Sequence, residues 1–127
     1  MPDHADRAVV AVVDDDPRIL ESLEYLLESA DYAVVVFPSA GAFLESACLA
    51  TIDCLISDID MPATDGFELL LAVHAIQPAL PVILITGHPE MLDRLRYARA
   101  NHHALFTKPF DGPALLAAVG DAVGTPD

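Results

Sequence analysis

Several side chains suited to phosphate chemistry stand at or just beyond the ends of short apolar runs in this sequence. They are Asp14, Asp15, Asp58, Thr86 and Lys108, the last being the only lysine in the chain. Clustered carboxylates repel one another unless a cation joins them, and Mg²⁺ binds carboxylate, carbonyl and water oxygens. Such a cation, a lysine and a hydroxyl suit the charge that develops on a transferring phosphoryl group. If the fold brings these residues together, they predict phosphoryl transfer.

The elements that must position these residues alternate between two types. Apolar runs typical of strands covered on both faces occur at 8–13, 34–37, 53–57, 81–86 and 104–107. Helix-start signals and helical spacing indicate helices at 17–28, 39–48, 67–76, 89–100 and 113–123. This alternation predicts a parallel sheet with helices on both faces. In such sheets the ligand site lies beyond the carboxyl ends of the strands, where the five residues stand.

Each residue also has an ordinary structural interpretation. Asp16 before Pro17 is typical of a helix cap, and Thr86 is of a type that caps helices. Asp14 and Asp15 equally suit a solvated turn, and a lysine after a strand is usually a surface residue. The functional interpretation is favoured because unrelated structural roles would not require all these residues to fall at one end of one sheet.

The same residues lie in motifs that resemble the receiver domains of two-component response regulators. The motifs are Val-Val-Asp-Asp-Asp-Pro (12–17), Asp-Ile-Asp-Met-Pro (58–62), Asp-Gly (65–66), Ile-Thr-Gly-His (85–88) and Lys-Pro-Phe (108–110). The resemblance runs from about Val9 to Val123, and the last two motifs are most similar to nitrogen-fixation transcription regulators. It implies an α/β doubly wound domain whose five-stranded parallel sheet has the flavodoxin-like order 2-1-3-4-5. We expect one receiver domain over 1–127, with its core at about 9–123 and no output domain in the chain.

The resemblance implies a role for each acidic residue. Asp58 would accept a phosphoryl group from a histidine kinase or a phosphotransfer protein, forming an acyl phosphate. Asp15 and Asp58 would bind Mg²⁺, or alternatively Mn²⁺, directly. Asp14 would hold a metal-bound water, and the backbone carbonyl of Asp60 would be a further metal ligand.

The resemblance also implies how the phosphoryl group is sensed. Lys108 would pair with a phosphoryl oxygen, and Thr86 would move toward the phosphoryl group and report its presence. The Lys108–Pro109 bond is expected to be cis. A downstream protein would bind the face formed by the fourth helix, the fifth strand and the last helix. The domain would be a monomer or a phosphorylation-dependent dimer.

Basic residues gather on the predicted fourth helix, at Arg94, Arg96 and Arg99. In a chain of formal net charge −14 they suggest a docking patch for an acidic partner. The alternative is pairing within the helix, for instance between Glu90 and Arg94.

Three positions depart from the family pattern, and one change is mild: the Gly-Ala pair that usually precedes the last strand is Asn101-His102 here, and Asn tolerates the left-handed conformation that the glycine would supply. The family usually carries an aromatic residue three positions before the lysine, whereas this chain has Leu105 there and Phe106 beside it. Without that aromatic residue, the sequence does not predict how a movement of Thr86 would be transmitted to the partner face. Side chains at the positions of Asp60 and His88 tune phosphoryl lifetime in the family, and a carboxylate at Asp60 predicts an altered rate of dephosphorylation.

Composition excludes several other classes of protein. Twenty acidic residues against six basic ones give a surface that repels nucleic acid. No apolar run approaches the roughly 20 residues of a membrane span. Cys48 and Cys54 are the only cysteines, and with no recognisable leader they indicate the cytoplasm. The scattered histidines lack the spacing of a transition-metal site.

Two alternative functions remain open at this stage. A hydrolase of the haloacid-dehalogenase type also uses an aspartyl phosphate, and Asp58 and Asp60 have the spacing of its two aspartates. The order of the motifs and the lack of a cap domain argue against it. The other alternative is a pseudo-receiver, a protein-binding module that is never phosphorylated, for which Leu105 is the best support. We expect a self-modifying switch and not a conventional turnover enzyme.

Overall fold

The computed structural model describes residues 7–46, 48–60, 66–88 and 104–124. Its five strands are β1 (Val9–Val13), β2 (Ala33–Phe37), β3 (Cys54–Asp58), β4 (Val82–Thr86) and β5 (Ala104–Thr107). They form one parallel sheet in the order β2-β1-β3-β4-β5, which confirms the predicted order. The central strands β3 and β4 are buried along their whole length, as their unbroken apolar sequences predict.

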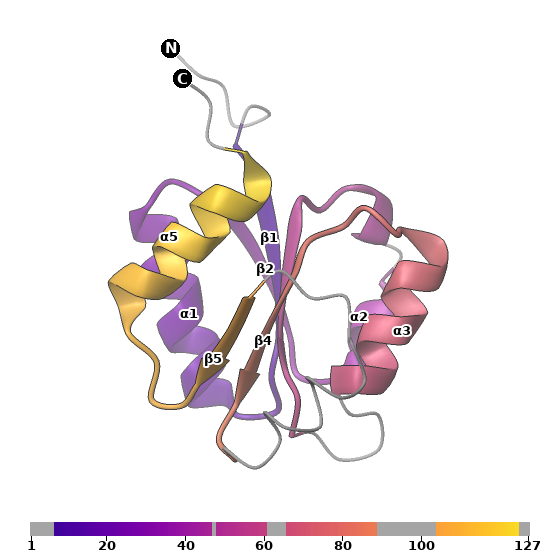
Figure 1. Ribbon diagram of the computed structural model, residues 1–127, viewed down its shortest axis with the longest axis horizontal. Coiled ribbons are helices and arrows are strands. Elements are labelled where there is room, and N and C mark those ends of the chain that lie inside the picture. Colours follow the sequence, from indigo (N-terminus) through magenta and orange to yellow (C-terminus); the bar gives the residue numbers. More distant parts are fainter. Residues whose placement is uncertain (1–6, 47, 61–65, 89–103, 125–127) are drawn as a thin grey trace.

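Helices cover both faces of this sheet (Figure 1). The helices α1 (Pro17–Ser29) and α5 (Gly112–Val123) lie on one face, and α2 (Ala40–Glu45) and α3 (Gly66–Ile76) lie on the other. Each face has its own cluster of buried side chains, so the sheet separates two halves of the core. None of the described helices is long and apolar enough to cross a membrane.

The signals that begin the first two helices act as predicted. The Asp16 side chain accepts a hydrogen bond from the Arg18 amide at 3.0 Å, and Ser39 Oγ accepts one from the Ala42 amide at 3.1 Å. The second helix ends earlier than predicted, at Glu45, because the amide and hydroxyl of Ser46 both donate to the Phe43 carbonyl. A short 3₁₀ turn follows at Cys48–Ala50. The predicted fourth helix at 89–100 lies outside the described residues.

The register of the strands brings their carboxyl ends to one edge of the sheet, at the bottom of Figure 1. Val13 is paired with Ser57, and Asp58 with Ile85. On the next strand pair, Thr86 lies beside Thr107. The residues that follow these positions therefore meet at the same edge, which is where the candidate site is found.

Two neighbouring leucines on α3 test the assignment of the core. Leu70 is 2% exposed and Leu71 is 71% exposed. We expect Leu70→Ala to lower the free energy of unfolding by about 2–5 kcal/mol, because it leaves a cavity as well as losing apolar burial. Leu71→Ala, the same change on the same helix, should alter it by no more than about 0.5 kcal/mol. Urea denaturation of both variants measures the difference, and equal effects would contradict this placement of α3.

Candidate functional site

The five predicted side chains collect at the carboxyl edge of the sheet. Asp14 and Asp15 follow β1, Asp58 ends β3, Thr86 ends β4 and Lys108 follows β5. Three of these polar residues are almost completely buried, with exposed fractions of 1% for Asp14, 3% for Asp58 and 0% for Thr86. Burying polar groups costs free energy unless they have partners, so their partners define the site.

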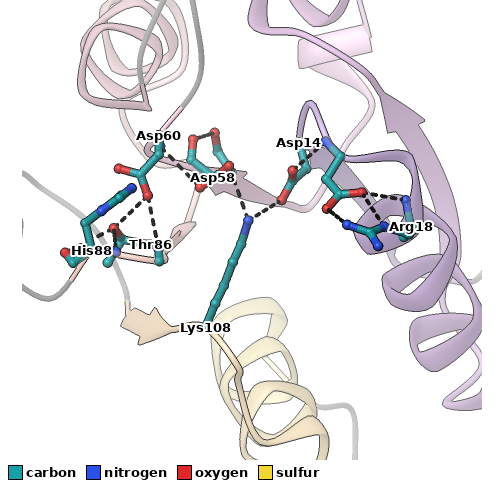
Figure 2. Close-up of polar contacts among 10 residues, drawn as sticks. Asp14, Arg18, Asp58, Asp60, Thr86, His88 and Lys108 are labelled. Atoms are coloured by element: carbon teal, nitrogen blue, oxygen red, sulfur yellow. Dashed lines mark hydrogen bonds and ion pairs between the residues drawn. The ribbon is translucent and has the colours of Figure 1, made fainter.

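Lys108 joins two strands through its side chain (Figure 2). Its Nζ lies 3.2 Å from Asp14 Oδ2 and 3.3 Å from Asp58 Oδ2. The other carboxylate oxygens accept backbone hydrogen bonds, Asp14 Oδ1 from the Asp16 amide at 2.9 Å and Asp58 Oδ1 from the Asp60 amide at 3.2 Å. Both oxygens of each buried carboxylate are therefore paired. The peptide bond between Lys108 and Pro109 is cis, as the resemblance implies.

The three charged groups shift one another's protonation. Burial raises the pKa of Asp58, and the charge of Asp14 raises it further, against the Asp60 amide and Lys108. Burial likewise raises the pKa of Asp14, although the Asp16 amide and Lys108 oppose the change. Burial alone would lower the pKa of Lys108, but the charges of Asp58 and Asp14 outweigh it and the pKa is raised. One ammonium therefore compensates the two buried carboxylates only in part.

A third carboxylate increases the negative charge. Oxygens of Asp14, Asp15 and Asp58 lie within 4.8 Å of one another, with Asp15 exposed and the other two buried. These are hard oxygen donors of the kind that Mg²⁺ and Mn²⁺ bind, and the exposed side leaves room for water ligands. The donor set therefore fits a divalent cation. The Asp60 carbonyl as a further ligand stays a prediction from the resemblance.

The side chain of Asp60 has a role that the sequence did not reveal. Its Oδ2 accepts hydrogen bonds from the Thr86 hydroxyl at 2.9 Å and from the Gly87 amide at 3.0 Å. The Thr86 hydroxyl in turn accepts a bond from the His88 amide at 3.0 Å. The Thr86 hydroxyl is thus held by Asp60 and by His88, which lies just beyond β4, and not by Asp58. The one sequence signal for this contact was that the ends of β3 and β4 were predicted to be adjacent.

Leu105, which stands where the family usually has an aromatic residue, and its neighbour Phe106 face opposite sides of the sheet. Leu105 packs against the cluster that contains Phe43 and Leu69, from α2 and α3. Phe106 packs against the cluster that contains Leu23 and Leu115, from α1 and α5. Because successive side chains of a strand alternate between faces, Phe106 does not replace the aromatic residue missing at Leu105.

Two other residues considered in the sequence, Cys54 and His74, lie in the described part of the chain and do not join the site. Cys54 packs in the core, and burial raises the pKa of its thiol to about 12, so it remains a thiol at neutral pH. The His74 ring contacts the Leu80 carbonyl at 3.0 Å, between α3 and the residues before β4. The predicted basic patch at 94–99, together with His102 and His103, lies outside the described residues, as does the Cys48 side chain.

The raised pKa of Asp58 predicts how acidity affects stability in the presence of a chelator. Because its pKa is higher folded than unfolded, the folded state binds more protons between the two values, and the free energy of unfolding falls as pH rises through that window. Asp58→Asn should therefore stabilise the metal-free protein at neutral pH, and the gain should shrink as pH falls toward 3.8. Denaturant titrations at several pH values measure this gain.

Asp16→Asn is the matched control for this measurement. The side-chain hydrogen bond from Arg18 lowers the pKa of Asp16, so its contribution has the opposite sign. Removing that charge should destabilise the protein at neutral pH. A gain for Asp58→Asn that did not depend on pH would contradict the electrostatic account.

The comparisons with known proteins agree with this geometry. The sequence profile of the response regulator receiver domain family matches residues 10–120. Transcriptional regulatory protein FixJ of Azorhizobium caulinodans is 36% identical over 115 residues, which make up 91% of this chain and 54% of that protein. The solved receiver domain protein of Clostridium thermocellum has a TM-score of 0.83 at 28% identity, covering 91% of this chain and 94% of that one. The structure of FixJ-N has a TM-score of 0.80 at 29% identity, covering 100% and 98%.

The match extends over most of the chain, and the resemblance to FixJ regulators is confirmed in both sequence and fold. The chain spans about half the length of these regulators, between 54% and 56%. The profile, the relatives and the strand order all lead to one assignment. This chain belongs to the response regulator receiver domain family of two-component signalling.

Proposed function

We propose that Asp58 is the phosphoacceptor of this receiver domain. The observation that carries the proposal is the contact of the Lys108 ammonium with Asp58, at 3.3 Å. The Asp58 carboxylate is almost completely buried and also belongs to the cluster of three carboxylates. A nucleophile needs its negative charge preserved while the oxygens of an incoming phosphoryl group are neutralised. A lysine and a set of cation ligands on either side of one carboxylate meet both needs.

The proposed reaction is transfer from a phosphohistidine. A carboxylate oxygen of Asp58 attacks phosphorus, the phosphorus–nitrogen bond of the phosphohistidine breaks, and a phosphorus–oxygen bond forms. The imidazole leaves with the electron pair and takes up a proton. Lys108 remains close enough to pair with a phosphoryl oxygen, since its contacts to Asp14 and Asp58 already place Nζ beside the nucleophile.

We propose Asp15 and Asp58 as direct ligands of Mg²⁺, with Asp14 holding a water bound to it and the Asp60 carbonyl as a further ligand. When bound, the cation neutralises negative charge on the phosphoryl oxygens. The indirect role of Asp14 comes from the resemblance and not from its contacts, because Asp14 and Asp58 each pair with Lys108 and with one backbone amide. Asp15, which is exposed, is free to turn toward a cation.

The signalling role is proposed at the level of class. Receiver domains act with histidine kinases, and we infer that a kinase or phosphotransfer protein in the cytoplasm supplies the phosphoryl group. Thr86 would report it to a protein partner at the face that the resemblance assigns to the predicted fourth helix, β5 and α5. In the FixJ relatives the matched region is about half of a transcription regulator.

One observation favours a second candidate function, that of a protein-binding module that does not depend on phosphorylation. Leu105 supplies no ring to the switch position, and Phe106 faces the opposite side of the sheet. A domain whose partner surface does not respond to Asp58 would work as a phosphorylation-independent binding module. Partner binding that is equal with and without a phosphoryl group would support this candidate.

Intact-mass measurement tests the proposed phosphoacceptor. After incubation with Mg²⁺ and a small phosphodonor such as acetyl phosphate, the wild type should gain the mass of one phosphoryl group. Asp58→Asn should gain none, because an amide oxygen is a poor nucleophile. Lys108→Met should slow the initial rate of this mass gain by about 10²-fold or more, the typical loss when one charge-stabilising donor is removed.

The chain offers a matched control. Asp53→Asn also changes an aspartate next to β3, but Asp53 accepts the Val9 amide at the opposite end of the strand. It should be phosphorylated like the wild type. A folded wild type that gains no phosphoryl mass with Mg²⁺ present would instead favour the binding module.

Thermal unfolding tests the metal site. At a Mg²⁺ concentration 100 times its dissociation constant, the free energy of unfolding should rise by about 2.7 kcal/mol. Asp15→Asn should remove most of this rise, because it takes one carboxylate from the cluster. Asp16→Asn should keep it, since Asp16 faces Arg18 and is outside the cluster. Equal responses of the two variants would refute Asp15 as a ligand.

A further inference from the structure

Two hydrogen-bond donors at the end of β4 are held by the side chain of Asp60. The Thr86 hydroxyl and the Gly87 amide both donate to Asp60 Oδ2, at 2.9 Å and 3.0 Å. In Figure 2 this carboxylate points toward Thr86 and not toward Lys108. A carboxylate acceptor makes such bonds about twice as strong as bonds between neutral groups.

These donors lie beside Asp58. Asp58 is paired with Ile85, so the next residues on the neighbouring side are Thr86, which ends β4, and Gly87, which follows it. The Asp60 amide donates to Asp58 Oδ1 at 3.2 Å, which ties the residues after β3 to the same place. The Thr86 hydroxyl and the Gly87 amide each have one hydrogen. While Asp60 accepts both, neither is available to another anion.

We propose that the Asp60 side chain is an internal competitor for a phosphoryl group on Asp58, an inference that rests on the function proposed above. A phosphoryl group brings nearly two negative charges and three acceptor oxygens to this edge. Thr86 and Gly87 are the neighbouring donors that would bind those oxygens, and Asp60 already occupies them. The Asp60 carboxylate also repels the added charge. Asp60 thus stabilises the resting state and must release both donors when the domain is phosphorylated.

A positioning role for Asp60 would have the opposite consequence. If Asp60 held Thr86 ready for the phosphoryl group, removing the carboxylate would leave Thr86 less well oriented and weaken binding. If Asp60 competes, removing it frees the Gly87 amide and leaves the Thr86 hydroxyl only its longer contact with the His88 carbonyl, at 3.3 Å, so binding strengthens. The sign of the change in affinity therefore separates the two roles.

The affinity for beryllofluoride, an unreactive mimic of a phosphoryl group on a carboxylate, measures this sign. With Mg²⁺ and the full chain, Asp60→Ala should lower the dissociation constant about tenfold or more, as expected when two charge-assisted hydrogen bonds no longer have to be broken. Asp60→Asn keeps an acceptor oxygen for Thr86 but loses the charge, so an intermediate affinity is expected. Unchanged or weaker binding by both variants would overturn the proposal.

Asp111→Asn controls for the loss of one negative charge. Asp111 is exposed beyond β5, directly before α5, and its side chain makes no capping hydrogen bond. This variant should bind beryllofluoride like the wild type. A tightening equal to that of Asp60→Ala would assign the effect to overall charge and overturn the proposal.

Two further measurements distinguish failure of this inference from failure of the proposed function. If the wild type gains no phosphoryl mass and binds no beryllofluoride, the proposed function and the competition by Asp60 are both contradicted. If the wild type gains the phosphoryl mass and binds beryllofluoride, but the Asp60 variants bind it no more tightly, only the competition by Asp60 is contradicted. In ligand-free protein the Gly87 amide proton should move upfield in Asp60→Ala, because it loses a charged acceptor. An unmoved resonance in a folded variant would contradict the hydrogen bond on which the inference depends.

Discussion

The Lys108 ammonium lies between two carboxylates that are almost completely removed from water, and the carboxyl edge of the sheet depends on this contact. Asp14 and Asp58 extend from the neighbouring strands β1 and β3, where their like charges repel in a medium less polar than water. Lys108 reaches them from β5, on the far side of β4. The ion pairs therefore connect three strands, yet they leave negative charge uncompensated. That remaining charge is what suits the site to a cation and to a transferable anionic group.

Much of this arrangement could be predicted from the sequence because it follows from chain topology. Apolar runs of strand length alternate with helical patterns, and this alternation requires a parallel sheet. All carboxyl ends of a parallel sheet lie at one edge, so Asp58 and Lys108, 50 residues apart in the chain, were expected to meet. The helix starts at Asp16 and Ser39 were equally predictable, since a capping side chain and its target amide are local in sequence.

The parts that the sequence did not predict depend on the direction of individual side chains. Asp60 follows a strand, and whether its carboxylate turns toward Asp58, toward water or toward Thr86 depends on the backbone of the connecting segment. No hydrophobic period specifies that choice. The early end of α2 has a similar origin, because Ser46 bonds back to the Phe43 carbonyl and competes with continued helix. Pattern-based prediction therefore stops where a short polar side chain near the end of an element has several possible partners, in contrast to the helix caps at Asp16 and Ser39.

The backbone of Thr86 is anchored on the side of β5, where its carbonyl accepts the Lys108 amide at 2.7 Å. Its side chain is fully enclosed. A hydroxyl that leaves Asp60 must consequently turn about the Cα–Cβ bond, in a step of about 120° between staggered rotamers. Threonine carries a methyl group on the same carbon, so this rotation moves an apolar group at the same time. Rotation of the Thr86 side chain would therefore change the packing around β4 as well as the hydrogen bonds at its end.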